Sequence, residues 1–217
     1  MLVVGTTGTE PPLNATTKDG QIIGLDADIA KGIAASMGVE VRFKPMPFSE
    51  LLPALHADKV DIILSSMTMT PERNLKVAFI GPYYISGKGM LAKTQTLASL
   101  QAAEGLNDPQ FKVAALKAST SQAFVEKTAP KATLVPAKSY DEALDFLFED
   151  QIDVIIADYD VSDKVRGLIG RELEEHYAEL PLIYLVGEKN VRQVANTLKS
   201  GIWDFVQKDQ LFKLVPS

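Results

Sequence analysis

"LLPALHADKVDIILSS" (residues 51–66) aligns without a gap with "ALDFLFEDQIDVIIAD" (residues 143–158), and this internal match decides the fold. Each segment ends an apolar helix, passes through an acidic turn and enters an apolar strand. The alignment places Asp58 opposite Asp150 in that turn. A matched helix–acid–strand unit favours a chain of two similar lobes, and the simpler alternative is a pattern shared by many α/β proteins.

The same alignment pairs residues on either side of the two apolar strands. Asp61 matches Asp153 where the strands begin, and Ser66 matches Asp158 where they end. Ligands of open α/β sheets gather at the carboxyl ends of the strands. Ser66 and Asp158 are therefore predicted to occupy equivalent places in the two lobes.

Outward from this repeat, apolar strands and helices alternate along most of the chain. Strands are expected at 2–4, 39–43, 60–64, 111–116, 134–135 and 152–157, and helices at 26–37, 48–57, 121–127 and 140–148. This alternation predicts an α/β fold of two lobes, each a mainly parallel sheet flanked by helices. The first predicted lobe covers residues 1–90 and the second covers 91–217, although residues 181–217 alternatively return to the first lobe.

The first of these helices shows how its ends and its apolar face are predicted. Asp26 is expected to cap its N-terminus, and Gly38 is expected to end it. Ile29, Ile33 and Met37 recur every four residues and predict an apolar stripe.

The composition excludes several classes of protein. The 217 residues are 46% hydrophobic and 23% charged, with a net charge of −6, which argues against a nucleic-acid partner. The absence of cysteine excludes disulfides, cysteine-ligated metals and thiol nucleophiles. No apolar stretch reaches the length that crosses a membrane.

The N-terminus bears on the cellular compartment. Residues 1–5 read directly as a strand and lack the regions of a secretory signal peptide. We therefore expect a cytoplasmic protein, which fits an engineered chain, or a periplasmic or extracellular protein in which Met1 replaces a leader.

Motifs for catalysis, cofactors and metals are absent from the sequence. There is no Walker motif and no GxGxxG, and His56 and His176 are read as solvated or packed side chains. Asp26 and Asp28 are explained more simply by helix capping than by a metal. The sequence therefore predicts no enzyme, no cofactor and no metal site.

Polar residues at the predicted strand ends suit a small zwitterion. Arg73 is able to clamp a carboxylate, helped by donors at Ser66 and Thr68. Pairing of Arg73 with Glu72 or Asp61 on the surface is the alternative.

The second predicted lobe offers a complementary set. Ser119 and Thr120 begin a helix, where free N–H groups favour an anion, and Asp158 and Glu10 suit an ammonium group. A plain N-cap at Ser119 and a loop cap at Asp158 are the alternatives.

These residues also carry a family resemblance. "GTTGTEPPLN" (5–14), "FSELLPALHADKVDIILSSMTMTPER" (48–73) and "GPYY" (81–84) resemble the first lobe of the type II periplasmic amino-acid-binding proteins, the solute-binding components of ABC importers. "FKVAALKASTSQAFVEK" (111–127) resembles the start of their second lobe. The match covers roughly residues 1–160 and implies two α/β lobes that close over one amino acid.

The resemblance also implies roles for the candidate residues. Arg73 would hold the ligand α-carboxylate with help from Ser66, Thr68 and Thr120, and Asp158 would take the α-amino group. Phe48 would pack on the ligand side chain, and Glu10 would tune the choice of side chain. The remaining predicted ligand-binding residue is Ser119.

Two positions depart from the pattern of that family. Leu13 replaces a more usual aromatic residue after Pro11 and Pro12, which argues against a strongly stacked ligand side chain. Ala118 replaces a common glycine before Ser119, so backbone approach there is expected to be tighter.

After residue 150 the chain also resembles the second half of a response-regulator receiver domain. Asp158 would fall at that family's phospho-acceptor position and Lys208 at its invariant lysine. Leu116–Ala118 offers no acidic pair to bind magnesium, and Val186 stands where Thr or Ser is expected. This resemblance implies a recombined or engineered chimera with a flavodoxin-like second lobe, which retains neither binding nor phosphotransfer.

Overall fold

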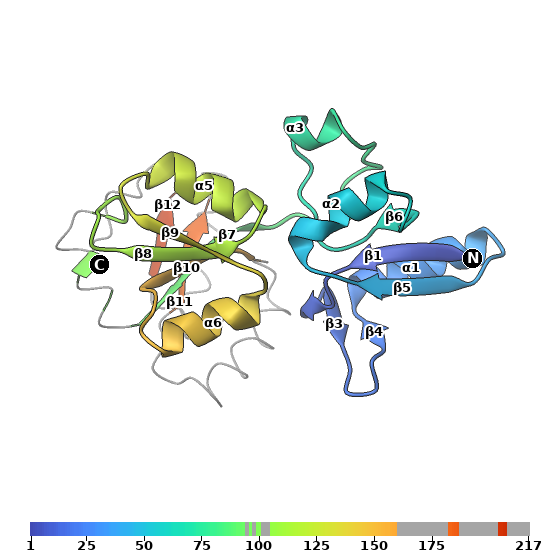
Figure 1. Cartoon of the computed structure of the whole chain (residues 1–217), viewed down its shortest axis with the longest axis horizontal. Coiled ribbons are helices and arrows are strands. Elements are labelled where there is room, and N and C mark those ends of the chain that lie inside the picture. The colour runs from blue at the N-terminus through green and yellow to red at the C-terminus, as the bar shows by residue number, and fades with distance from the viewer. Residues whose placement is uncertain (94–95, 97–98, 101–104, 160–181, 187–203, 208–217) are drawn as a thin grey trace. The chain divides into compact units, whose positions relative to one another are not determined.

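The computed structural model describes residues 1–93, 96, 99–100, 105–159, 182–186 and 204–207 (Figure 1). The chain divides into two compact units. The first unit comprises Met1–Tyr84 with Lys138–Asp141, and the second comprises the other described residues from Ile85 onward. Both units combine helices with β-sheet, so the predicted α/β class is confirmed.

A parallel sheet of three strands forms the centre of the first unit, in the order β5-β1-β6. A second, antiparallel sheet has the order β2-β3-β4. The elements of this unit are β1 (Leu2–Thr6), β2 (Thr9–Glu10), β3 (Asn14–Thr16), β4 (Ile22–Ile23), α1 (Leu25–Ser36), β5 (Val41–Pro45), α2 (Phe48–His56), β6 (Ile62–Ile63) and α3 (Pro71–Asn74).

Helix α1 corrects two predictions. Its N-cap is Gly24 rather than Asp26, and no side chain caps it. Gly24 has φ 110°, and a Cβ there would lie 2.5 Å from the Leu13 carbonyl oxygen, so only glycine fits. The stripe of larger apolar residues reaches the core only at Ile29, because Ile33 and Met37 are exposed.

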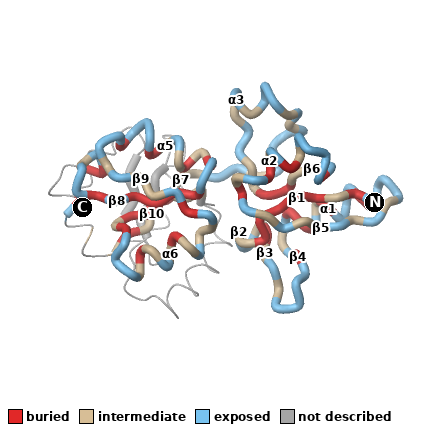
Figure 2. Tube along the Cα trace, viewed as in Figure 1, coloured by how far each residue is buried: buried red, intermediate tan, exposed pale blue. Residues whose placement is uncertain are grey.

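Small residues instead face the core from α1. Ala30 and Ala34 pack with Leu2, Val4 and Leu64 of the parallel sheet and its continuation. Figure 2 shows that β1, in the centre of this sheet, is largely buried. Alanine side chains allow the helix backbone to approach the sheet closely, which the larger Ile33 and Met37 would prevent. The four-residue period was therefore correct for the helix, but Ile33 and Met37 lie off the face that packs on the sheet.

The second unit contains one sheet of six strands in the order β12-β11-β7-β10-β8-β9. β8, β9 and β10 run parallel, whereas β7 runs antiparallel to both β10 and β11. The elements are β7 (Gly87–Ala92), β8 (Lys112–Leu116), α5 (Thr120–Thr128), β9 (Thr133–Ala137), α6 (Tyr140–Phe148), β10 (Val154–Tyr159), β11 (Leu182–Val186) and β12 (Asp204–Gln207).

Helices α5 and α6 cover opposite faces of this sheet, which explains its continuous apolar strands. Val125 of α5 packs in one cluster with Val113 and Val154. Leu147 of α6 packs in another cluster with Ala114. Since adjacent strand residues point to opposite faces, Val113 and Ala114 assign the two helices to different sides of β8 (Figures 1 and 2).

The internal repeat is visible in the backbone of both units. Asp58 and Asp150 both have positive φ, 54° and 57°. The Asp61 carboxylate accepts from the Val3 N–H at 2.7 Å. Asp153 accepts in the same way from the N–H of Lys112, the residue that begins β8, at 2.8 Å.

The structure also bears on the division of the chain. The boundary predicted after residue 90 falls inside β7, because hydrogen bonds to β10 and β11 tie that strand into the sheet of the second unit. β11 and β12 belong to the same sheet. Lys208, the predicted equivalent of the receiver lysine, and His176 lie outside the described residues. The receiver-like hypothesis therefore stays a prediction.

Candidate ligand-binding site

Residues beyond the carboxyl ends of β1 and β6 form a buried polar network in the first unit. The Thr7 N–H donates to Ser65 Oγ at 2.9 Å, and Thr7 Oγ1 donates to Asn14 Oδ1 at 2.8 Å. The Gly8 N–H donates to the same Asn14 oxygen at 2.8 Å. Because Ser65 and Asn14 are fully buried, these bonds fix the loop that follows β1.

Asp26 is the centre of this network and was missed by the sequence reasoning. Its side chain lies in the first turn of α1 and is only 1% exposed. Its carboxylate accepts from Asn14 Nδ2 at 2.7 Å, from the Tyr83 hydroxyl at 2.8 Å and from Ser66 Oγ at 3.5 Å. Burial raises the pKa of Asp26, and the three donors oppose that shift.

A sequence signal for this role existed. Asp26 stands four residues before Ala30 and eight before Ala34, so it continues the small-residue face that packs on the sheet. A carboxylate on a core-facing stripe needs partners from other elements, whereas a capping carboxylate does not.

Ser66 and Tyr83 complete the first-unit network. Ser66 has φ 51°, in the left-handed region, and its N–H donates to the Tyr83 hydroxyl oxygen at 3.3 Å. Burial, then the nearby Asp26 carboxylate, raises the pKa of the Tyr83 phenol above its usual range. The predicted site residue Ser66 is thus held in a strained conformation by the buried acid.

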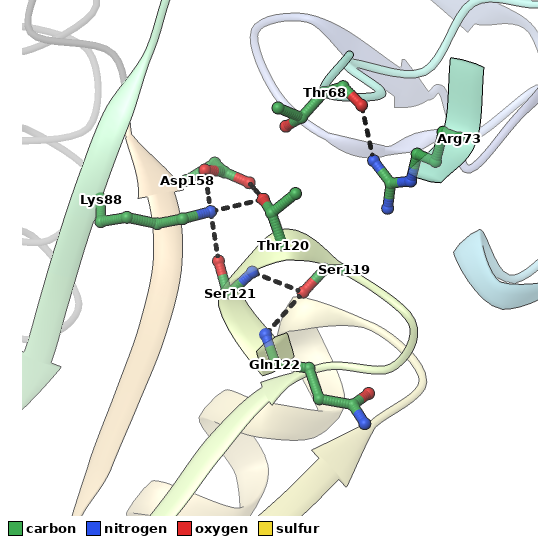
Figure 3. Close-up of polar contacts among 8 residues, drawn as sticks. All are labelled: Thr68, Arg73, Lys88, Ser119, Thr120, Ser121, Gln122 and Asp158. Atoms are coloured by element: carbon green, nitrogen blue, oxygen red, sulfur yellow. Dashed lines mark hydrogen bonds and ion pairs between the residues drawn. The ribbon is translucent and has the colours of Figure 1, made fainter. Parts of the chain in front are cut away.

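Arg73 and Thr68 are in contact through the Thr68 backbone, whereas their predicted roles toward a ligand stay predictions. Arg73 Nη1 donates to the Thr68 carbonyl oxygen at 2.8 Å (Figure 3). The guanidinium carbon lies 5.5 Å from the centroid of the Phe48 ring. The stacking contact and the carbonyl position the guanidinium before any ligand arrives. Phe48 is itself only 7% exposed, so its ring serves as a support for Arg73.

Glu10 lies on the short strand β2 and is partly buried. Its Oε1 accepts from the Thr7 hydroxyl at 3.3 Å. Glu10 is therefore connected to the loop that follows β1, within the same unit as Arg73.

The remaining predicted residues meet at the start of α5 in the second unit. Ser119 is the N-cap, and its hydroxyl oxygen accepts from the N–H groups of Ser121 and Gln122 at 3.2 and 3.1 Å. Thr120 Oγ1 donates to Asp158 Oδ2 at 3.3 Å. The capping interpretation of Ser119 is therefore confirmed, and Thr120 and Asp158 are brought together.

Lys88 is a second residue that sequence reasoning missed. Its ammonium donates to Thr120 Oγ1 at 2.6 Å and to Ser121 Oγ at 3.0 Å, and it forms a short contact with Asp158 Oδ1 (Figure 3). The Lys88 side chain is 11% exposed and that of Asp158 is 30% exposed. This arrangement can hold a carboxylate in place and neutralise it.

Ala118 immediately precedes this cluster and has φ 62°. A non-glycine residue in the left-handed region carries a steric cost. Alanine at this position therefore carries backbone strain, which differs from the tighter backbone approach that was predicted, and the Ala118 N–H donates to Gln122 Oε1 at 2.8 Å.

Among the residues that the structure describes, no group of histidine, cysteine, aspartate or glutamate side chains is arranged to hold a metal ion. None of the helices in the described part of the chain is both long enough and apolar enough to cross a membrane.

The chain is similar to known proteins. The family model of the bacterial extracellular solute-binding proteins, family 3, matches residues 2–99. A probable histidine-binding protein of Campylobacter jejuni is 34% identical over 180 residues, which is 82% of this chain and 67% of that protein. The ABC transporter arginine-binding protein 1 of Escherichia coli (strain K12) is 29% identical over 71% of this chain and 61% of that protein.

A solved structure agrees with these matches. An ancestral amino acid-binding protein, described as a precursor of cyclohexadienyl dehydratase, superposes with a TM-score of 0.70 at 33% identity. The match covers 79% of this chain and 74% of that one. The chain therefore belongs to the bacterial extracellular solute-binding proteins, family 3, although it spans only 61% of the length of the arginine-binding relative.

Proposed function

We propose that this protein binds a small amino acid or a similar zwitterion, as the solute-binding component of an ABC importer. The observation that carries the proposal is the position of the Arg73 guanidinium, which is fixed by contacts within the protein. The guanidinium stands over the Phe48 ring and is anchored on the Thr68 carbonyl oxygen, beyond the carboxyl ends of the parallel strands. A guanidinium in this setting suits a ligand carboxylate.

The other residues have supporting roles in this proposal. Ser66, Thr68 and Thr120 help Arg73 to hold the α-carboxylate, and Ser119 fixes the start of α5. Asp158 receives the α-amino group. The side chains of Phe48 and Glu10 face the variable part of the ligand.

The relatives support the wider proposal. The named ones are histidine-binding and ABC transporter arginine-binding proteins. We infer a non-enzymatic transport role, with importer membrane subunits as partners and a periplasmic or extracellular location. No step of this role involves a nucleic acid, a cofactor or a metal.

Thermal unfolding in the presence of each of the twenty amino acids tests the proposal. A ligand at a hundredfold over its dissociation constant stabilises the folded protein by about 2.7 kcal/mol. R73A should weaken binding of that amino acid by at least about a hundredfold, since it removes the charged partner of the carboxylate. The matched control is K76A, which removes an exposed cation three residues away. If no amino acid shifts the transition, the proposed function is wrong.

The alternative is a chimera with a receiver-like second half and neither binding nor phosphotransfer. One observation favours it: Asp158 lies near the end of a parallel strand with a lysine ammonium beside it. Incubation with a phosphodonor and magnesium, followed by intact mass, tests transfer to Asp158. The residues after β8, Leu116–Ala118, supply no acidic pair for magnesium, so no gain in mass is expected.

A further inference from the structure

Lys88 and Asp158 face each other across two antiparallel strands. Lys88 lies on β7 and is the register partner of Asp158 on β10. Directly opposed residues of an antiparallel pair project their side chains from the same face of the sheet. The contact between them is therefore built into the strand pairing and lies wholly within the second unit.

The Lys88 ammonium uses hydrogen-bond acceptors at the start of α5 and on β10. An ammonium has three N–H donors, and here they are directed to Thr120 Oγ1, Ser121 Oγ and Asp158 Oδ1. Thr120 also donates to the other Asp158 oxygen at 3.3 Å. With only 11% of its side chain exposed, Lys88 is a buried cation matched to a partly buried carboxylate.

An α-amino group would use the same partners. It also presents N–H donors on a positive charge, and it would need Asp158 and the nearby hydroxyl oxygens as acceptors. Two ammonium groups on one carboxylate repel each other, and displacing Lys88 leaves a nearly buried cation with fewer acceptors. Lys88 therefore competes with the amino group of a ligand.

We infer that Lys88 is a specificity-determining residue, which lowers the affinity for α-amino acids relative to carboxylates that lack the amine, such as 2-oxo acids. A 2-oxo acid places a carbonyl oxygen where the amine would be, so the Lys88–Asp158 pair stays intact. This inference rests on the proposed function, because it assumes that the ligand's α-substituent meets Asp158.

Matched pairs of ligands test the inference by calorimetry. The probes are alanine with pyruvate, leucine with 4-methyl-2-oxopentanoate, phenylalanine with phenylpyruvate, and glutamate with 2-oxoglutarate. K88M should raise the affinity for the amino acid of a bound pair by about tenfold, which equals about 1.4 kcal/mol. Affinity for the 2-oxo acid should stay equal or fall, so the ratio of the two affinities shifts toward the amino acid.

Control variants distinguish an effect of the Lys88 charge on ligand affinity from a general effect of substitution on folding. K88R keeps a cation opposite Asp158 and should keep the wild-type ratio. K93M removes a lysine that pairs with Asp150 just beyond the same strand, and it should leave the ratio unchanged. D158N in the K88M background should cancel the gain, since no carboxylate remains for the amine.

The outcomes distinguish the two proposals. If an amino acid binds the wild-type protein and K88M leaves the ratio unchanged or lowers amino-acid affinity, this inference is overturned and the proposed function stands. If neither member of any pair binds wild type or K88M, and no amino acid shifts thermal unfolding, both are overturned.

Discussion

The two units each place a carboxylate near the ends of their parallel strands, but they satisfy it by different means. The Asp26 carboxylate of the first unit accepts hydrogen bonds from neutral groups, the Asn14 amide and the Tyr83 hydroxyl. The Asp158 carboxylate of the second unit forms an ion pair with the Lys88 ammonium. A carboxylate held by neutral groups and fully buried serves to position its neighbours, whereas one held by a cation and partly exposed is open to exchange with a ligand.

The two carboxylates are held differently although the two units share the same sequence repeat. Asp61 and Asp153 make the same backbone hydrogen bond in each unit. The repeat maintains the sheet, while the residues beyond it, Ser66 and Asp158, have different chemistry. The shared architecture therefore carries two different arrangements, a buried carboxylate that positions Ser66 and the Lys88–Asp158 pair for which we propose exchange with a ligand amine.

The strongest way to break this comparison is to remove the buried acid. D26A leaves the buried Asn14 amide and the Tyr83 hydroxyl without their acceptor, and it should lower the free energy of unfolding by about 3 kcal/mol. Chemical denaturation measures the loss. D26N, which keeps an acceptor oxygen, should cost less; an equal loss for both variants would contradict the hydrogen-bonding role.

The ionisation of Asp26 gives a second, smaller effect. Because its pKa is raised from 3.8, the folded protein binds its proton more tightly than the unfolded chain does. This contribution to stability is complete below the unfolded pKa and is lost as the pH rises through the folded pKa. The difference in unfolding free energy between D26N and wild type should therefore move in favour of D26N as the pH rises above the unfolded pKa of 3.8. A pH-independent difference would show that Asp26 keeps its ordinary pKa.

The repeat offers a matched pair of changes. D61A and D153A each remove one carboxylate that accepts a backbone N–H, so each should lower the free energy of unfolding by about 1 kcal/mol. Urea denaturation of both variants compares the two units directly. Losses that differ by more than about 1 kcal/mol would show that the shared hydrogen bond has unequal importance.

The smallest expected effect concerns the strained residue before α5. A118G should raise the free energy of unfolding by about 0.5 kcal/mol, because glycine accepts the positive φ without steric cost while adding flexibility to the unfolded chain. A123G, within α5, is the control and should lower stability by about 1 kcal/mol. A loss of stability in both variants would argue against strain at Ala118.

Local patterns predicted a large part of this molecule. The bounds of α6 were predicted in full, and the strands at the centres of both units were placed within a few residues. These elements depend on apolar periodicity, helix caps and turn residues, which operate over a few positions in the chain. The capping role of Ser119 follows from the same local signals.

The candidate site was predicted in part for the same reason. Residues at or just beyond strand ends, such as Asp158 and Ser66, were predicted as site candidates because parallel strands bring their carboxyl ends to one edge. Lys88 was passed over because it stands between two glycines in a strand segment, with no local sign of a partner. Asp26 was taken for a cap because acidic residues at helix starts usually are caps.

The sequence by itself determined the α/β class, the internal repeat and the strand ends where polar residues gather, since each depends on neighbours in the chain. Only the tertiary structure decided what holds the two carboxylates. Tyr83 reaches Asp26 across 57 residues, and Lys88 reaches Asp158 across 70. Such contacts depend on strand register and on burial, which place the two side chains within hydrogen-bonding distance only after the whole unit has folded.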